Sequence, residues 1–288
     1  MKLRDAFISG KFVVTAEAGP GKGTDVSEFL HNADLLKGKV DAVNCTDQQS
    51  AVMRVGSLAA CILLKEKGVQ PILQMTCRDR NRISLQSELL SAAVLGIENV
   101  LALTGDDVTL GDHPHAKPVF DLDSVSLLYA AKQLEAGMDL AGKELKGLPK
   151  FFMGACVTPG ADPIGPQMIK LEKKIKAGAE FIQTQAVYEP DKFATFMKEA
   201  GSFGVPVMAG IVVLKSAGMA KFMNKNVAGI NVPDSLIAEM EKAEDKVRKG
   251  LEISARLIKE MKPMCQGTHI MAIGMEHRVP EIVEMAGL

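Results

Sequence analysis

The sequence predicts a single (β/α)8 barrel, the TIM-barrel form of the α/β class, in which eight parallel strands close into a cylinder covered by helices. Eight short apolar runs rich in β-branched residues recur along the chain, separated by stretches long enough for a helix and a return loop. Strands that are apolar on both faces and alternate with helices are typical of a parallel sheet. Polar, reactive side chains gather where the runs end, which is where such a barrel carries its chemistry.

The strands follow from the apolar runs, and the helices follow from the spacing of apolar residues between them. After the first run, Phe29, Ala33 and Leu36 recur at the spacing of one helix face. The predicted strands, in chain order, are Phe12–Ala18, Ala42–Thr46, Pro71–Cys77, Asn99–Gly105, Phe151–Val157, Phe181–Val187, Pro206–Val213 and Gly267–Gly274.

Several positions outside the strands carry specific expectations. Thr24 and Ser84 are placed to cap the helices that follow the first and third strands. Asp106–Pro118 is a long polar loop after the fourth strand, and such loops are usually functional. Asp234–Lys262 predicts a charged amphipathic helix outside the barrel, or two consecutive helices. We expect this surface to make any contact with a second copy or a partner, although a solvated outer helix explains the pattern as well.

Length and composition fit one soluble barrel. A chain of 288 residues is normal for this fold, and 47% apolar content supports a large buried core. No linker, low-complexity tract or block of charge divides residues 1–288, which predicts a single domain. No segment reaches about eighteen consecutive apolar residues, so we expect no membrane insertion and a cytoplasmic location.

Composition also argues against nucleic acid and metal ions as ligands. The net charge is −1 with both signs interspersed, and the chain has no Trp and only two Tyr on which bases could stack. The five Cys are far apart and form no CxxC pair, which predicts reduced thiols and no metal site. His113 and His115 form an HxH pair, but no third converging ligand can be named.

Glu17 is a carboxyl group near the end of an otherwise apolar strand, followed by a Gly-Pro-Gly turn. A carboxyl in such a partly desolvated position is suited to general acid catalysis. A structural carboxylate paired with a nearby Lys or Arg would give the same pattern. Position alone leaves both interpretations open.

Asp106 and Gln185 are two further polar groups at predicted strand ends. Asp106 follows Gly105 and could face a ligand, although an Asp that caps its own turn fits as well, and Asp107 competes for the role. Gln185 could read the amide-like edge of a heterocycle, or it could be a core amide satisfied by neighbours. His269 lies in the last apolar strand, where a hydrogen-bonded core residue is the more frequent role.

Four of these segments together resemble the methylenetetrahydrofolate reductases, flavoproteins that convert 5,10-methylenetetrahydrofolate into 5-methyltetrahydrofolate. TAEAGPG resembles the family's first strand with its terminal acid, NVLALTGDD its "ALRGD" strand, and LEKKIKAGAEFIQTQAVYE its "KxxAGAxxxxTQ" motif. AGIVVL and GTHIMAIG match the seventh and eighth strands more loosely. The pairing of Gly-Asp after strand four with AGA…TQ at strand six is specific, whereas either one alone is weak.

The resemblance implies a FAD-dependent oxidoreductase of one-carbon metabolism with flavin and folate at the C-terminal face of the barrel. It places the general acid on Glu17, the aspartate that contacts flavin and pterin on Asp106, and the folate-binding glutamine on Gln185. A flavin-phosphate lysine falls on Lys174. The cofactor contacts that it implies are Asn44, Gln74, Thr104, Asp106, Thr158, Lys174 and Ala179.

Some of these positions depart from the enterobacterial pattern around the flavin. Gln74 stands where that pattern has His, Asn44 replaces Thr, Thr104 replaces the Arg of "ALRGD", and Thr158 replaces the Tyr of a Tyr-Pro pair. In this the chain looks like the short, single-domain type of anaerobes and acetogens. The electron donor stays open among NADH, NADPH, ferredoxin and a separate redox subunit, and the substrate between tetrahydrofolate and a methanopterin.

Two other functions fit the same fold. A pterin-binding methyltransferase barrel would bind no flavin, so the colour of the purified protein distinguishes it. A non-catalytic barrel subunit of a redox complex would not need Glu17, Asp106 and Gln185 together at the C-terminal end of the barrel. Either a homo-oligomer or a hetero-oligomer is compatible with the sequence.

Overall fold

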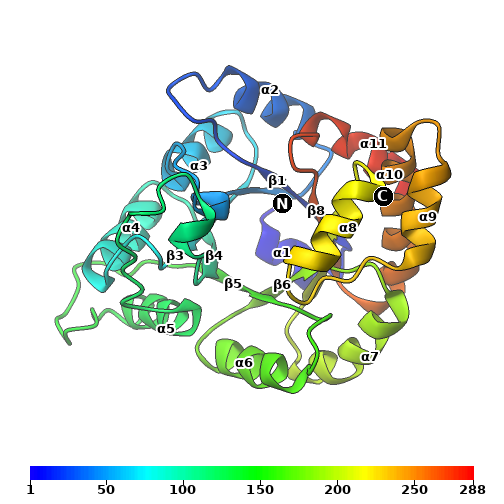
Figure 1. The fold of residues 1–288 in the computed structure, drawn as a ribbon. Helices are drawn as coiled ribbons and strands as arrows, with labels where there is room; N and C mark the ends of the chain where they lie inside the picture. Colours follow the sequence, from blue (N-terminus) through cyan, green and yellow to red (C-terminus); the bar gives the residue numbers. More distant parts are fainter.

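The structure is a computed structural model that describes residues 1–288. Eight parallel strands form a closed barrel in sequence order, with β1 paired to both β2 and β8 (Figure 1). All eight predicted strands are confirmed within a few residues. Their bounds are β1 Val13–Ala18, β2 Ala42–Cys45, β3 Pro71–Thr76, β4 Asn99–Leu103, β5 Phe152–Val157, β6 Phe181–Ala186, β7 Val207–Val212 and β8 Gly267–Met271.

Helices surround the barrel (Figure 1). The α-helices are α1 Leu3–Ile8, α2 Ser27–Leu36, α3 Ser57–Glu66, α4 Arg82–Val94, α5 Ser124–Glu135, α6 Gly165–Lys176, α7 Pro190–Ala200, α8 Ala217–Asn226, α9 Asp234–Lys242, α10 Lys246–Met261 and α11 Val279–Ala286. Short 3-10 turns are η1 Gln49–Ala51, η2 Val108–Leu110, η3 Gly201–Phe203, η4 Lys262–Met264 and η5 Glu276–Arg278. None of these helices has the length and apolar character that crossing a membrane requires.

Helix boundaries confirm one expectation and correct another. The segment 234–262 forms two helices, and the side chain of Asp245 caps the second by accepting from Arg248 N. The predicted caps Thr24 and Ser84 are wrong. Helix α2 begins after Val26, and α4 is capped by Asn81, whose Oδ1 accepts from the amides of Ile83 and Ser84. An Asn two or three residues ahead of those amides satisfies the free N–H groups directly.

The N-terminal end of the barrel is closed by apolar side chains and by α1, an element that the sequence did not predict. The ring of Phe7 from α1 lies 6.1 Å from that of Phe152 and 6.3 Å from that of Phe181. Gly154 is required here, because a Cβ at this position would lie 2.2 Å from the Phe181 ring. The cluster at this end comprises Leu3, Ala6, Val13, Ala42, Ile72, Leu101, Phe152, Phe181 and Met208.

One layer nearer the C-terminal end, the barrel interior becomes polar. Successive residues of a strand point to opposite faces, so positions two residues beyond the apolar cluster also point inward. These positions hold Thr15, Asn44, Gln74 and Gln183, joined by His269 of β8, and none is more than 7% exposed. Interior layers of such barrels are usually filled by branched aliphatic residues. The polar layer therefore sits directly beneath the face where chemistry is expected.

Candidate active site at the barrel mouth

A cavity of about 730 Å³ opens at the C-terminal ends of the strands. Its volume lies within the usual range for sites that bind small molecules and cofactors. The predicted site residues that line it are Glu17, Gln74, Thr104, Asp106, Thr158, Lys174 and Gln185. The fold therefore brings together, around one cavity, side chains that are distributed over most of the chain.

Glu17 is 9% exposed and forms no ion pair with a lysine or arginine. Its Oε1 accepts a hydrogen bond from Gln49 Nε2 at 2.9 Å, and its Oε2 lies 3.4 Å from Gln74 Nε2. The alternative of a carboxylate fixed by a basic neighbour does not apply in this structure. Glu17 is held by neutral amides instead, and it faces the cavity.

Behind Glu17, the polar layer forms a connected hydrogen-bond network. Gln74 Nε2 lies 3.4 Å from Asn44 Oδ1, and Asn44 Nδ2 lies 3.4 Å from His269 Nδ1. Thr15 Oγ1 lies 2.9 Å from the same imidazole nitrogen. Asn44 is fully buried and does not line the cavity, so its contact with a ligand would be made through Gln74.

Asp106 and its neighbour Asp107 have different environments. Asp107 caps its own turn, and hydrogen bonds from Thr109 lower the pKa of Asp107. Asp106 lines the cavity, and its Oδ2 accepts from the backbone N–H of Ser50 at 3.1 Å. The turn-capping role therefore belongs to Asp107, which leaves Asp106 as the carboxylate that faces the cavity.

The turn after β2 contacts the carboxylates of both Glu17 and Asp106. The sequence analysis did not predict this turn as part of the site. Gln49 bonds Glu17 while Ser50 bonds Asp106. Gln48, Ser50 and Ala51 adopt positive φ values of 50°, 56° and 56°, a conformation that costs about 1–3 kcal/mol for a residue other than glycine. The one available signal was the run of polar residues, DQQS, after the second predicted strand.

Partly buried ion pairs fix the base of this turn. Asp47 accepts from the backbone N–H of Thr76 at 2.8 Å and pairs with Arg80, which also pairs with Glu88 at 2.5 Å. Asp47 and Arg80 thereby connect the β2 loop to the end of β3. Burial together with the charge of Asp123 raises the pKa of the Cys77 thiol in this region to about 12, so that thiol is not a nucleophile.

Strand β6 presents two amides to the cavity. Gln185, at the mouth, is exposed, and no side-chain hydrogen bond satisfies its amide, so it is not a satisfied core residue. Gln183, two residues earlier, is 4% exposed, and its Oε1 has no hydrogen-bond partner. Gln183 was not predicted, although its spacing from Gln185 in the QTQ run places both on one face of the strand.

Helix α6 contributes cationic groups to the cavity. Lys174 is 8% exposed, its Nζ donates to the carbonyl of Cys156 at 2.5 Å, and burial lowers its pKa. Lys170 lines the same cavity one turn earlier. Ala179 does not line it: this buried residue precedes the N-terminal end of β6, and the mouth lies at the other end of that strand. We therefore do not include Ala179 among the groups that face a cofactor.

Apolar side chains form another part of the cavity lining, which also was not predicted. Most of it comes from α8 and the segment that follows, and Phe222 is 62% exposed. Such a wall can cover the face of a flat heterocycle. Its members are Met219, Phe222, Met223, Val227, Ile230 and Ile273.

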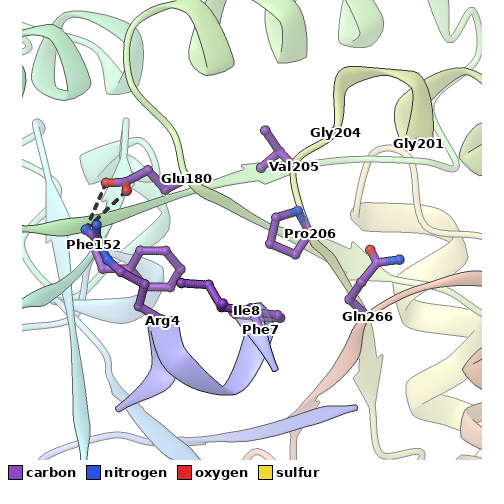
Figure 2. Close-up of a pocket in the computed structure, with 10 residues that line it drawn as sticks. All are labelled: Arg4, Phe7, Ile8, Phe152, Glu180, Gly201, Gly204, Val205, Pro206 and Gln266. Atoms are coloured by element: carbon purple, nitrogen blue, oxygen red, sulfur yellow. Dashed lines mark hydrogen bonds and ion pairs between the residues drawn. The ribbon is translucent and has the colours of Figure 1, made fainter. Parts of the chain in front are cut away.

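A second cavity, of about 520 Å³, lies at the N-terminal end of the barrel (Figure 2). Its charged groups are already paired: Arg4 donates to the carbonyl of Phe151 at 2.5 Å and contacts Glu180 at 3.1 Å. Arg4 also lies over the ring of Phe152, 5.0 Å from its centroid. Because these groups satisfy one another, this cavity offers less than the mouth for binding or catalysis.

Comparison with known proteins identifies a family. The family model described as "Methylenetetrahydrofolate reductase" matches residues 2–287. Methylenetetrahydrofolate reductase 2 of Schizosaccharomyces pombe is 27% identical over 257 residues, which cover 80% of this chain and 37% of that protein. A probable methylenetetrahydrofolate reductase (NADPH) of Caenorhabditis elegans is 24% identical over 246 residues, covering 81% and 34%. The chain thus spans about a third of the length of these relatives.

Among solved structures, a protein from Clostridium thermocellum superposes with a TM-score of 0.70 at 15% identity, covering 99% of this chain and 97% of that one. That protein binds two copies of 5-methyl-5,6,7,8-tetrahydrofolic acid. A 2,3-dimethylmalate lyase superposes with a TM-score of 0.55 at 12% identity, covering 98% and 82%. At these identities the similarity supports the barrel fold alone.

Proposed function

We propose, from the premise that this chain belongs to the methylenetetrahydrofolate reductase family, that it reduces 5,10-methylenetetrahydrofolate to 5-methyltetrahydrofolate with a bound FAD. The observation that supports this proposal most directly is that several polar side chains at the cavity have few partners within the protein. Glu17 forms no ion pair with a lysine or arginine, and Asp106, Gln183 and Gln185 face the same cavity with capacity for further hydrogen bonds.

The charged and apolar side chains that line the cavity suit a flavin dinucleotide. Lys170 and Lys174 supply positive charge for phosphates, and the wall around Phe222 offers an apolar surface for a planar ring system. Thr104, Thr158 and Gln74 are the remaining predicted cofactor contacts that line the cavity. When bound, reduced FAD would supply the hydride that this reaction requires.

Glu17 is the group that can move a proton. In its protonated form it would give the proton to N10 of the substrate as the bond between N10 and the methylene carbon breaks and its electron pair stays on N10. The lone pair of N5 then forms a double bond to the methylene carbon, which gives a cationic iminium. The amides of Gln49 and Gln74 hold the Glu17 carboxyl group toward this position.

Asp106 and the two glutamines would orient the substrate. The negative charge of Asp106, which lines the same cavity, would stabilise a cationic iminium nearby. Gln183 and Gln185 can each donate and accept, which suits the alternating donors and acceptors of a pterin edge. A folate ligand in a barrel of this shape is also supported by the methyltetrahydrofolate that the C. thermocellum protein binds.

The proposal also concerns the donor that reduces the flavin. Relatives carry names with either NADH or NADPH, while Thr104, Gln74, Asn44 and Thr158 depart from the enterobacterial pattern around the flavin. We therefore expect slow direct oxidation of NADH, with faster electron transfer from a separate redox subunit. Such a redox subunit would dock where the flavin edge is exposed. The outer surface of α9 and α10 is where a second copy or another partner would meet the chain, as part of a homo- or hetero-oligomer.

Flavin loading and reduction test the proposal. Protein incubated with excess FAD and passed through gel filtration should retain about one flavin per chain by its visible absorption. The flavin is then mixed anaerobically with NADH, NADPH or reduced ferredoxin, and separately with a reduced dye. Dye-driven formation of 5-methyltetrahydrofolate is the expected result. Protein that retains no flavin but transfers methyl groups from the folate would instead be a methyltransferase barrel.

A further inference from the structure

His269 lies in the polar interior layer, one layer beneath Glu17. It occupies the middle of β8 and is fully buried. Its Nδ1 has two neighbours, Thr15 Oγ1 at 2.9 Å and Asn44 Nδ2 at 3.4 Å. Its Nε2 is buried and has no hydrogen-bond partner. The nearest carboxylate oxygen is Glu17 Oε2, at 3.8 Å from Nε2.

The contact with Asn44 favours one of the two tautomers of the neutral imidazole. Gln74 Nε2 donates toward Asn44 Oδ1, which turns the Nδ2 group of Asn44 toward the ring of His269. An amide NH₂ group can only donate, so Nδ1 of a neutral imidazole accepts when it pairs with Asn44, and the Thr15 hydroxyl can donate to the same nitrogen. The proton of the neutral ring therefore lies on Nε2, and this N–H is the group nearest Glu17.

The Nε2–H group adds a third neutral donor to the surroundings of the Glu17 carboxylate. Gln49 and Gln74 approach from the mouth and from β3, whereas His269 approaches from below. A carboxyl group that has released its proton is an anion in a mostly enclosed site, and it is stabilised by donors aimed at it. A movement of Glu17 by less than about 1 Å would bring Nε2 within hydrogen-bond distance.

We propose that His269 is a positioning residue for Glu17, and that its neutral imidazole donates Nε2–H to the Glu17 carboxylate formed when Glu17 gives its proton to the substrate. The inference rests on the proposed function for its kinetic consequence. Thr15 and Asn44 hold the ring in the tautomer that this donation requires. The imidazole itself does not contact the substrate.

Two substitutions of His269 distinguish the role of Nε2 from that of Nδ1. The amide NH₂ of His269→Gln can reach toward Glu17 in the manner of Nε2, whereas the shorter amide of His269→Asn lies near the position of Nδ1 and leaves Glu17 without the donor. We expect kcat for dye-driven folate reduction to fall roughly tenfold or more in His269→Asn, with KM and flavin content unchanged, and to recover in large part in His269→Gln. Equal losses in both variants, or a change confined to KM, would overturn the assignment.

Thr268→Val is the matched control. Thr268 is 1% exposed, lies next to His269 on β8 and donates to the carbonyl of Ala209 at 3.0 Å on the other side of the strand. Its replacement also removes a buried polar group, but it should leave kcat unchanged. A fall in kcat for Thr268→Val equal to that of His269→Asn would show a general packing effect and would contradict the positioning role.

A measurement on the wild-type protein keeps this inference independent of turnover. Nitrogen NMR of ¹⁵N-histidine-labelled protein distinguishes the two neutral tautomers and the imidazolium, and the missing signal in His269→Gln assigns the residue among the five histidines. A neutral ring protonated on Nε2 is the expected result. A ring protonated on Nδ1, or on both nitrogens, would overturn the inference. Wild-type protein that shows the expected tautomer but reduces no folate would refute the proposed function instead.

Discussion

At its N-terminal end the barrel is filled by the rings of Phe7, Phe152 and Phe181, whereas at its C-terminal end the same strands carry carboxylates and amides with few protein partners. The polar groups at the N-terminal end are paired, as in the contact between Arg4 and Glu180 (Figure 2). Gln183 Oε1 at the mouth and His269 Nε2 one layer beneath it are buried and have no hydrogen-bond partner.

The comparison indicates that the N-terminal end of the barrel mainly stabilises the fold, whereas the C-terminal end mainly serves function. A buried polar atom without a partner costs about 1–3 kcal/mol, so its retention needs a compensating role. Strained turns have a similar cost, and the turn of Gln48–Ala51 also lies at the mouth. Substitutions at the N-terminal end should therefore lower stability and leave chemistry intact. Substitutions at the mouth should change chemistry without a loss of stability.

The largest expected effect is on stability, from Phe181→Ala. This substitution empties the centre of the aromatic cluster and should lower the free energy of unfolding by about 3–5 kcal/mol. Turnover per folded molecule should stay near that of the wild type, because Phe181 lies away from the mouth. Denaturant unfolding and kinetics with reduced dye check both parts. A loss of kcat without a loss of stability would break the comparison.

The next largest effect is on turnover, from Glu17→Gln. The amide keeps the shape of the side chain but cannot donate the proton, so folate reduction should fall by about a hundredfold or more. Flavin content and folate affinity should be retained. Steady-state kinetics with reduced dye give the answer. Near-normal reduction by this variant would make Glu17 a structural carboxylate.

A smaller effect is expected on flavin affinity, from Lys174→Met. Removal of this cation should weaken FAD binding by roughly tenfold, because a charge-assisted contact with phosphate is lost. Burial lowers the pKa of Lys174, so the free protein loses this charge at a lower pH than for an ordinary lysine. Since phosphates bind the protonated form, FAD affinity should decrease as pH rises through that range.

Lys173→Met is the control for this prediction. Lys173 is an exposed residue of the same helix that does not line the cavity. Fluorescence titration with FAD at several pH values should show wild-type affinity and wild-type pH dependence for this variant. Equal weakening in both variants would indicate only a general loss of positive charge.

The smallest expected effect comes from Gln183→Leu, and it should have opposite signs for stability and binding. Replacing an amide whose Oε1 is unpaired should raise the free energy of unfolding by up to about 1 kcal/mol. Folate KM should rise a few-fold, because one hydrogen bond to the substrate is lost. Chemical denaturation and KM measurements test the two signs. A destabilised variant with unchanged KM would mean that the amide serves the fold.

The strands could be predicted because each is an apolar run bounded by turn residues, and the eight runs leave room for a helix between them. Helix α1 could not be predicted in the same way. It has six residues, and its amphipathic character is clear only once the end of the barrel that it covers is known. Asn81, rather than Ser84, caps α4 because the cap depends on where the chain turns.

The mouth was predictable only in part. Glu17, Asp106, Gln185 and Lys174 could be identified through motifs, and the fold places all four around one cavity. The Gln49 side chain that bonds Glu17 and the Ser50 backbone N–H that bonds Asp106 come from a turn without a motif. Such long-range contacts leave no local signal.

The direction in which His269 and Gln183 point was equally hidden in the sequence. A strand that is apolar on both faces does not reveal which of its residues face the barrel interior. The resemblance also marked Asn44 and Ala179 as cofactor contacts, whereas the fold places neither of them on the cavity.

The central claim is that the mouth transfers a hydride from bound flavin to a methylene folate, and a single-turnover measurement tests it most directly. FAD-loaded protein is reduced anaerobically, freed of reductant and mixed with 5,10-methylenetetrahydrofolate in a stopped-flow instrument, and the product is quantified. Our account predicts reoxidation of the flavin with about one 5-methyltetrahydrofolate formed per flavin, and much slower reoxidation in Glu17→Gln. Flavin that stays reduced in the wild-type protein, with no methyl product, would contradict it.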